Sequence, residues 1–451
     1  MHGLLALILL TFVVTASNAG AAPAAGSISV TAPWQVTVAA GVYHAGSATA
    51  VVKKSAVIVV EAPAPVTVHD EKHTALPIYN PKASGWSRGQ KMLKLVAMEC
   101  TKFGMLDPTS VVVRSASTEE TVFHKGVDYD FDPDWATFGR LENGAILPDR
   151  EVYLDYTYGI SRIDAIAVTK AGDVVHVIGI PDVVSPQPPA GPEGSVVIAN
   201  IWLPGRIAQL TDDNLYQIVE PVYPEKHSDH PPAETLLPKT WAKLKAGQTV
   251  NFLAWGDSIT AGGAASDVAH RYQERFATML REKFPNATIN MMTSGWGGRG
   301  SRNFLEDPPG AAHNFDEQVI GKHPDCVIVE FVNDGWMNAD QFEKYYDDYL
   351  DRFQKAGIEM IVTLPHYNMH QWMNGSKTDR ISEENRPYIK IIRDWATKHN
   401  VAIADWSGRW GHLQKEGIPY ETLLLNGINH PNNYGHEMFA LAILENFGGP
   451  K

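Results

Sequence analysis

The chain has only two cysteines, Cys100 and Cys326, and they lie far apart in the sequence. Cys326 falls within an apolar stretch, and neither thiol has the neighbours of a metal site, so we expect buried free thiols rather than a disulfide. Long runs of Lys and Arg are also absent, and the formal net charge is −13. An acidic surface repels nucleic acid and anionic lipid, which argues against both as partners.

Charged side chains are missing from the first 52 residues, which contain no Asp, Glu, Lys or Arg. The apolar block 3–14 is too short to span a bilayer comfortably but has the length of a signal-peptide core, and small residues follow at 17–19. We expect residues 1–19 to be a signal peptide, the protein to be secreted or periplasmic, and no stable membrane anchor. The usual basic residues ahead of the block are missing, so a buried N-terminal segment is the alternative.

The length of 451 residues and the hydrophobic share of 44% suit a folded protein of two or three domains. Over residues 27–220, short β-rich runs alternate with turn residues, and long helical periodicity is absent. This pattern predicts an all-β accessory domain such as a sandwich. Proline and polar residues at 221–247 predict a linker, in which His227 and His230 lack a third ligand for a metal site.

Part of this β-rich half resembles modules of phage tail and fibre proteins. The resemblance covers about seventy residues, and its implication would be attachment or oligomerisation without chemistry. It rests on the segments 129–131, 162–168, 179–181 and 194–198.

Strands and helices alternate over residues 248–451, which predicts a second domain. Strands separated by helices require a parallel sheet with right-handed crossovers, so we expect a three-layer, doubly wound α/β fold. Five strands suit the flavodoxin-like order 2-1-3-4-5, whose switch point lies between the first and third strands. The expected strands are 250–255, 288–292, 325–331, 359–364 and 401–404, and the expected helices are 271–283, 339–356, 383–399 and 435–447.

A serine follows the first of these strands, in the sequence Gly256-Asp257-Ser258. Such sheets bind ligands outside the carboxyl ends of their strands, so Ser258 is a candidate nucleophile, although an isolated Gly-Asp-Ser is also an ordinary capped turn. Asn333 follows the third strand. The topology alone therefore predicts that Asn333 lies near Ser258.

A serine nucleophile needs a base, and attack on a carbonyl needs donors for the developing oxyanion. His430, between the last strand and the final helix, is our candidate base, with His436 as the second choice. The glycine-rich segment 294–301 follows the second strand, where backbone N–H groups can approach a ligand closely. Gly298 N–H and the side-chain amide of Asn333 are the candidate donors.

These segments resemble four sequence blocks of the SGNH/GDSL hydrolases. The resemblance covers about residues 248–447, and the blocks occur in the family's order. It implies that Ser258 is the nucleophile, that the N–H groups of Ser258 and Gly298 and the amide of Asn333 form an oxyanion hole, and that His430 is the base. The implied reaction is ester hydrolysis through an acyl-enzyme, without a cofactor or metal. The blocks are Gly256–Ile259, Gly295–Gly298, Val332–Asp334 and His430-Pro431.

Two positions depart from the family pattern. Phe331 replaces the glycine that usually stands two residues before the asparagine, and we expect it to reshape the pocket wall. The acid that usually precedes the histidine by three residues is replaced by Gly427. We expect a Ser-His dyad oriented by a backbone carbonyl or by Asn426, with a remote carboxylate such as Asp405 as the alternative.

Aromatic and basic residues accompany the blocks. Trp296 and Trp336 fall in loops, where indoles can stack on sugar rings, and Arg299 is a candidate contact for an anionic substrate group. His366 and His370 have a spacing of four but no nearby carboxylate signature, so we expect pocket or loop contacts there rather than a metal pair.

The sequence therefore predicts an exported serine esterase that removes small acyl groups, such as acetyl, from a carbohydrate. Hydrolysis of lipid or aryl esters is an alternative within the same class. From a different class, the alternative is a non-catalytic attachment or carbohydrate-binding protein whose hydrolase domain is degenerate.

Overall fold

The computed structural model describes residues 26–117, 121–373 and 386–450. The chain divides into two compact units, the first formed by Met1–Val222 with Gln414–Gly427 and the second by Tyr223–Leu413 with Ile428–Lys451. The expected signal peptide, residues 1–19, lies outside the described residues. Among the residues that are described, no helix has the length and apolar character needed to cross a membrane.

The segment expected as a linker, 221–247, contains two short helices, α1 (Ala233–Leu236) and α2 (Pro238–Lys245). Pro238 occupies the first position of α2, where its missing N–H costs no hydrogen bond, and Leu244 buries its side chain. Apart from Pro221 and Val222, this segment belongs to the second unit. The second unit therefore extends further towards the N-terminus than residue 248.

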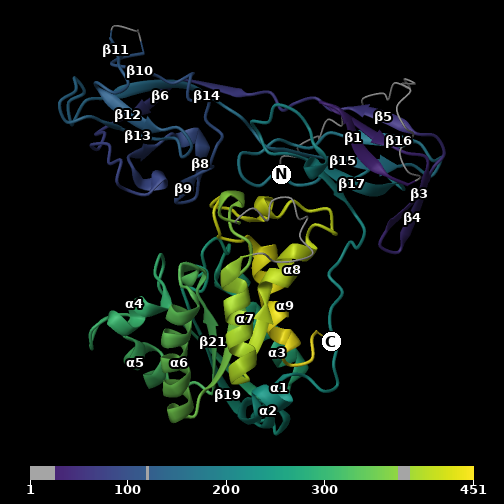
Figure 1. The fold of residues 1–451 in the computed structure, drawn as a ribbon, viewed down its shortest axis with the longest axis vertical. Helices are drawn as coiled ribbons and strands as arrows, with labels where there is room; N and C mark the ends of the chain where they lie inside the picture. The colour runs from purple at the N-terminus through teal and green to yellow at the C-terminus, as the bar shows by residue number, and fades with distance from the viewer. Residues whose placement is uncertain (1–25, 118–120, 374–385, 451) are drawn as a thin grey trace, which may run out of the picture. The chain divides into compact units, whose positions relative to one another are not determined.

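The first unit consists of antiparallel sheets and hairpins, which confirms the predicted strand-rich fold (Figure 1). The sheet orders are β1-β2-β5, β16-β15-β17-β18, β11-β10-β14-β6 and β12-β13-β7, with the hairpins β3-β4 and β8-β9. The strands are β1 (Ile28–Ala32), β2 (Gln35–Val38), β3 (Gly41–Ala45), β4 (Ala48–Val52), β5 (Ala56–Val59), β6 (Val66–His73), β7 (Gln90–Lys91), β8 (Val96–Ala97), β9 (Cys100–Thr101), β10 (Val112–Arg114), β11 (Val122–Phe123), β12 (Tyr129–Asp132), β13 (Thr137–Arg140), β14 (Val152–Tyr158), β15 (Arg162–Val168), β16 (Val174–Val177), β17 (Val196–Leu203) and β18 (Leu215–Gln217).

Two hydrophobic clusters stabilise this first unit. One joins β2, β4 and β5 to β15 and β17, and the other lies among β6 and β10–β14. In β14 every second residue is buried, the alternation expected of a strand with one face on a core. Cys100 lies in this unit and Cys326 in the other, and both are free and buried, as predicted.

The second unit is built on one five-stranded sheet of order β20-β19-β21-β22-β23. All four pairings between neighbouring strands are parallel. In chain order this is 2-1-3-4-5, so the predicted flavodoxin-like arrangement is confirmed. The strands are β19 (Thr249–Gly256), β20 (Thr288–Gly295), β21 (Cys326–Glu330), β22 (Glu359–Leu364) and β23 (Ala402–Asp405).

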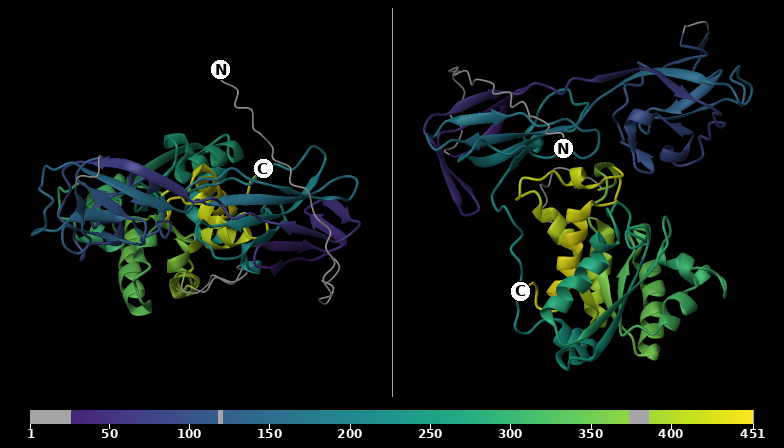
Figure 2. Two further views of the ribbon diagram at one scale, coloured as in Figure 1. Left: turned by 90° about the horizontal axis from the view of Figure 1, so that it is seen from above. Right: turned by 180° about the vertical axis from the view of Figure 1, so that it is seen from behind.

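Helices cover both faces of this sheet (Figures 1 and 2). Along β19, Phe252 packs against Phe276 of α3, whereas Trp255 packs on the opposite face against Tyr349 and Phe353 of α6. This alternation is what a strand buried on both faces requires. The helices of this unit, besides α1 and α2, include α3 (Tyr272–Lys283), α4 (Ser301–Glu306), α5 (Phe315–Gln318), α6 (Ala339–Ala356), α7 (Pro387–His399), α8 (Trp406–His412) and α9 (Asn433–Glu445).

Local sequence explains the longest helix, α6. The Asn338 side chain accepts a hydrogen bond from the N–H of Gln341 at its start, and Gly357 adopts a φ of 77° at its end. Between these caps, one face buries Phe342, Tyr346, Tyr349 and Phe353 at helical spacing.

Phe331 follows β21 and packs into this core rather than reshaping the pocket wall. Its ring is buried and lies 4.8 Å from Trp255 and 5.7 Å from Phe304, measured between ring centroids. The expectation that Phe331 reshapes the pocket wall is therefore wrong. Its large side chain fills space between the sheet and the helices on that face.

Truncation of Phe331 should consequently destabilise the second unit. We expect Phe331→Ala to lower the free energy of unfolding by about 3–5 kcal/mol, because a buried ring is replaced by a cavity. Urea unfolding of the full chain, followed by the helical circular dichroism signal, measures this loss. Val268→Ala, at a 58% exposed position, is the control and should change stability by less than about 0.5 kcal/mol. Equal stability of the two variants would contradict the core position of Phe331.

Candidate active site

Ser258 lies in a compact turn directly after β19. The N–H of Ala261 donates to the carbonyl of Asp257 at 3.0 Å, and the N–H of Gly263 donates to the carbonyl of Ser258 at 2.8 Å. Ser258 itself is only partly buried. The fold therefore presents this side chain at the carboxyl edge of the sheet, as the sequence predicts.

His430 lies beside this serine. Its Nε2 is 2.9 Å from the Oγ of Ser258. A neutral imidazole has one donor and one acceptor nitrogen, so Nε2 can accept the serine proton when the ring proton is on Nδ1. This is the geometry that a general base and a serine nucleophile need.

His436, the second choice for the base, is fully buried in the first turn of α9. Its Nδ1 accepts a hydrogen bond from the N–H of Tyr272 at 3.3 Å, and its Nε2 donates to the carbonyl of Gly263 at 3.1 Å. Both ring nitrogens are therefore engaged by the backbone. The structure brings His430, and not His436, to the serine hydroxyl.

The end of β21 is joined to the nucleophile turn by Asp257. One carboxylate oxygen accepts the N–H of Ile259 at 3.1 Å, and the other accepts the N–H of Asn333 at 3.1 Å. Asp257 is completely buried and acts here as a structural link between two loops. The predicted proximity of Asn333 and Ser258 follows from this link.

The glycine block reaches the same edge. The N–H of Trp296 donates to the carbonyl of Gly256 at 3.0 Å, and a methyl group on Gly297 would lie 3.8 Å from the Cβ of Ser258. Gly298 has a φ of 72°, a conformation that favours glycine. Asn333 Nδ2 donates to the carbonyl of Arg299 at 3.3 Å, which uses one of its two hydrogens.

Asp334, in the asparagine block, is hydrogen-bonded to the end of the glycine-rich segment. It accepts the N–H of Ser301 at 3.0 Å and the hydroxyl of Tyr346 at 3.0 Å. Burial raises the pKa of Asp334 to about 6. These contacts fix the loops that carry Gly298 and Asn333 relative to each other.

Residues 254–438 match the model of the GDSL-like lipase/acylhydrolase family. The C-terminal domain belongs to this family. The second unit is called the GDSL-like domain below, and family membership makes it a hydrolase domain that acts on esters. Residues 109–215 of the first unit match a domain of unknown function, DUF4815.

The comparison with curated proteins found no significant match. Among solved structures, a two-domain esterase (CEX) active on acetylated mannans is 21% identical, with a TM-score of 0.37, and the alignment covers 46% of this chain and 50% of that one. The acetylxylan esterase Axe2 from Geobacillus stearothermophilus is 21% identical, with a TM-score of 0.36 and coverage of 44% and 94%. LAE5, an alpha/beta hydrolase from the metagenome of Lake Arreo, Spain, is 22% identical, with a TM-score of 0.36 and coverage of 44% and 95%.

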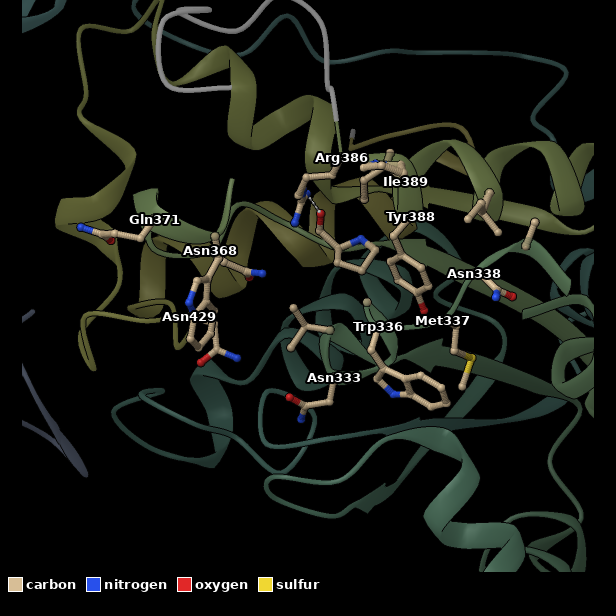
Figure 3. Close-up of a pocket in the computed structure, with 17 residues that line it drawn as sticks. Asn333, Trp336, Met337, Asn338, Asn368, Gln371, Arg386, Tyr388, Ile389 and Asn429 are labelled. Atoms are coloured by element: carbon tan, nitrogen blue, oxygen red, sulfur yellow. Dashed lines mark hydrogen bonds between the residues drawn. The ribbon is translucent and has the colours of Figure 1, made fainter. Parts of the chain in front are cut away.

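A pocket of about 710 Å³ adjoins the carboxyl edge of the sheet in the GDSL-like domain. It extends from Asn333 and from Asn429, the residue before His430, towards Arg386 (Figure 3). Trp336 lines the pocket and is 52% exposed, so one of the two predicted indoles lies where a substrate can contact it.

Trp296 and Arg299 lie elsewhere in the GDSL-like domain and are not among the residues that line this pocket. The indole of Trp296 stacks on His313 with 4.2 Å between ring centroids and packs at the edge of the core. The guanidinium of Arg299 lies 5.5 Å from the centre of the same indole. Their roles in substrate binding stay predictions.

The two side chains considered for orienting His430, those of Asp405 and Asn426, have other contacts. Asp405 caps α8, accepting the N–H of Gly408 at 2.8 Å, and pairs with Arg393 at 3.2 Å. Asn426, which belongs to the first unit, donates to Glu99 at 2.8 Å. Gly427 has no side chain to offer.

From the sequence, no role in the site was assigned to two buried side chains, Glu330 and His366. Glu330 accepts hydrogen bonds from the hydroxyl of Thr260 at 2.8 Å and the N–H of Val332 at 3.2 Å. Burial raises the pKa of Glu330, and burial together with the charge of Glu330 raises the pKa of Asp257. A single carboxylate in the otherwise apolar stretch 326–331, ahead of the asparagine block, was the available signal.

His366 is the second of these buried side chains, and the sequence indicated only a loop or pocket contact for it. It is fully buried, and its Nε2 donates to the carbonyl of Asn429 at 2.7 Å. Burial lowers the pKa of His366 to about 3 and that of His436 to about 4.

Within the described ranges, one group of side chains has the spacing of metal ligands, namely Glu343, Asp347 and His399. Asp347 accepts the indole N–H of Trp395 at 2.8 Å, and Glu343 pairs with Lys398. These partners satisfy the carboxylates as ordinary surface groups, and none of the three residues lines the pocket.

The depressed pKa of His436 should make stability depend on pH. The folded state keeps this ring neutral, whereas the unfolded chain protonates it below its ordinary pKa of about 6.5. The unfolded state therefore binds more protons, and this contribution to stability is lost as pH falls from about 6.5 towards 4.

We expect the stability difference between the wild type and His436→Gln to shrink by about 1 kcal/mol from pH 7 to pH 5.5. Urea unfolding of both proteins at each pH measures this difference, so that the titration of other groups cancels. A difference that is constant with pH would contradict a neutral, buried His436.

Proposed function

We propose that the protein is a serine esterase that works through an acyl-enzyme and removes acetyl groups from a carbohydrate. The observation that carries this proposal is the 2.9 Å contact between Ser258 Oγ and His430 Nε2 at the carboxyl edge of the sheet. Membership of the domain in the GDSL-like family supports it.

In the proposed mechanism, His430 Nε2 takes the hydroxyl proton while Ser258 Oγ bonds to the ester carbonyl carbon. The carbonyl oxygen becomes an oxyanion, which the N–H groups of Ser258 and Gly298 and the amide of Asn333 stabilise. When the C–O bond to the alcohol breaks, protonated His430 gives its proton to the leaving oxygen. Water then attacks the acyl-enzyme with His430 again as the base, and the acid and free Ser258 are released.

The chemistry of the pocket supports a neutral carbohydrate as the alcohol. Two partly exposed indoles, Trp336 and Trp372, offer faces for sugar rings. Side-chain amides on the lining offer both donors and acceptors for hydroxyl groups, and none of the described residues that line the pocket is Asp or Glu. These amides belong to Asn333, Asn338, Asn368, Gln371 and Asn429.

We also propose that the enzyme acts outside the cytoplasm. This rests on the uncharged N-terminal segment and its apolar block at residues 3–14. Polymeric carbohydrate esters are substrates that an exported enzyme can reach.

The role of Ser258 is tested by hydrolysis of a small chromogenic acetate and by labelling with a fluorophosphonate. We expect the wild type to be active and labelled at Ser258, and Ser258→Ala to lose about 10³-fold or more in kcat without labelling. Ser266→Ala, at an exposed serine outside the proposed machinery, is the matched control. Equal activity of Ser258→Ala and wild type would refute the nucleophile. Inactivity of the wild type on varied esters, together with sugar binding, would favour the attachment protein.

The role of Trp336 is tested by comparing an acetylated oligosaccharide with the chromogenic acetate. Loss of one stacking contact of about 1 kcal/mol should raise KM for the oligosaccharide about five-fold in Trp336→Ala, while the small acetate is unaffected. Trp241→Ala removes an indole that packs on Phe284 instead of lining the pocket and serves as the control. An unchanged KM for every oligosaccharide tested would argue against carbohydrate stacking.

A further inference from the structure

We propose that two buried histidines, His366 and His436, are positioning residues that hold His430 against Ser258. His366 fixes the backbone from which His430 extends, and His436 fixes the turn on which its ring rests. This inference rests on the proposed function, in which His430 is the base.

His366 holds the peptide group between Asn429 and His430 by a hydrogen bond. Its Nε2 is 2.7 Å from the carbonyl oxygen of Asn429, and because a carbonyl only accepts, Nε2 must carry the ring proton. Trp410 and Phe439 pack around the imidazole, with ring centroids 4.9 and 5.0 Å away. The hydrogen bond therefore fixes the peptide plane between Asn429 and His430 from a side chain that cannot easily rotate.

His436 controls the other side of His430 through Gly263. Its Nε2 donates to the carbonyl of Gly263 at 3.1 Å, and the N–H of the same glycine donates to the carbonyl of Ser258. A methyl group on Gly263 would lie 3.0 Å from three atoms of the His430 ring. The Cα of Gly263 therefore lies directly against the face of the catalytic imidazole.

The two histidines also suit this task electrostatically. Burial keeps both rings neutral, since it lowers the pKa of His366 to about 3 and that of His436 to about 4. Neutral donors keep the same hydrogen bonds while His430 gains and loses its proton. A permanent cation in either place would oppose the protonated state that His430 reaches during the reaction.

The decisive comparison is between His366→Gln and His366→Leu. The Gln amide can place a donor near the position of the imidazole Nε2, whereas Leu retains apolar volume without a donor. We expect His366→Leu to lose about 10- to 100-fold in kcat on the chromogenic acetate, with KM within two-fold, because a misplaced base slows the chemical step. His366→Gln should recover most of this loss.

Gly263→Ala tests the second contact without touching a histidine. We expect a similar loss in kcat and a shifted acid limb of the pH profile, because the added methyl group displaces the His430 ring. His399→Leu is the matched control. It removes an imidazole that packs on Trp395 at the C-terminal end of α7, and its activity should equal that of the wild type.

Full activity of both His366→Leu and Gly263→Ala would overturn the inference, while labelling of Ser258 would leave the proposed function intact. If the wild type is neither active nor labelled, the proposed function fails, and the positioning contacts are then read from ¹⁵N spectra of the histidines. Neutral Nε2–H rings for His366 and His436 at pH 6, and altered signals of His430 in Gly263→Ala, would support them. A protonated His366 or His436 at that pH would overturn them.

Discussion

The hydrogen bond from the N–H of Asn333 to the carboxylate of Asp257 joins the ends of β19 and β21. Each of these strands is followed by one part of the proposed machinery, the nucleophile after β19 and the oxyanion amide after β21. The parallel pairing places the strand ends side by side, and the carboxylate fixes the loops beyond them. Asp257 is buried and its other carboxylate oxygen accepts the N–H of Ile259, so this one side chain connects both loops.

Strand order and the pairing of Ser258 with His430 could be predicted from the sequence, because both depend on where the parallel strands end along the chain. Alternation of strands and helices specifies a parallel sheet, and residues after parallel strands meet at one edge. The side-chain directions were harder to predict. Phe331 stands next to the asparagine block, yet its ring points into the core against Trp255. Sequence position alone does not say which face of a strand end is buried.

Contacts between distant loops could not be predicted for a similar reason. The segment Gln414–Gly427 follows the last strand but belongs to the first unit, and no change of composition indicates this. The contact of His366 with Asn429 joins residues 63 positions apart through a backbone carbonyl, which any residue type can supply. A side-chain pattern can indicate a donor, but it does not indicate which carbonyl will accept.

Because Gly427 replaces the usual carboxylate, the orientation of the His430 ring needs another explanation. A carboxylate partner both orients an imidazole and stabilises its cation. Contacts from Gly263 and from the peptide of Asn429 can supply orientation, since they constrain the ring face and the backbone. The buried Asp257 also interacts electrostatically with His430: burial and the charge of Glu330 raise the pKa of Asp257, and His430 lowers it against these effects. In the proposed arrangement, His366 and His436 orient His430 indirectly, the first through the peptide of Asn429 and the second through Gly263.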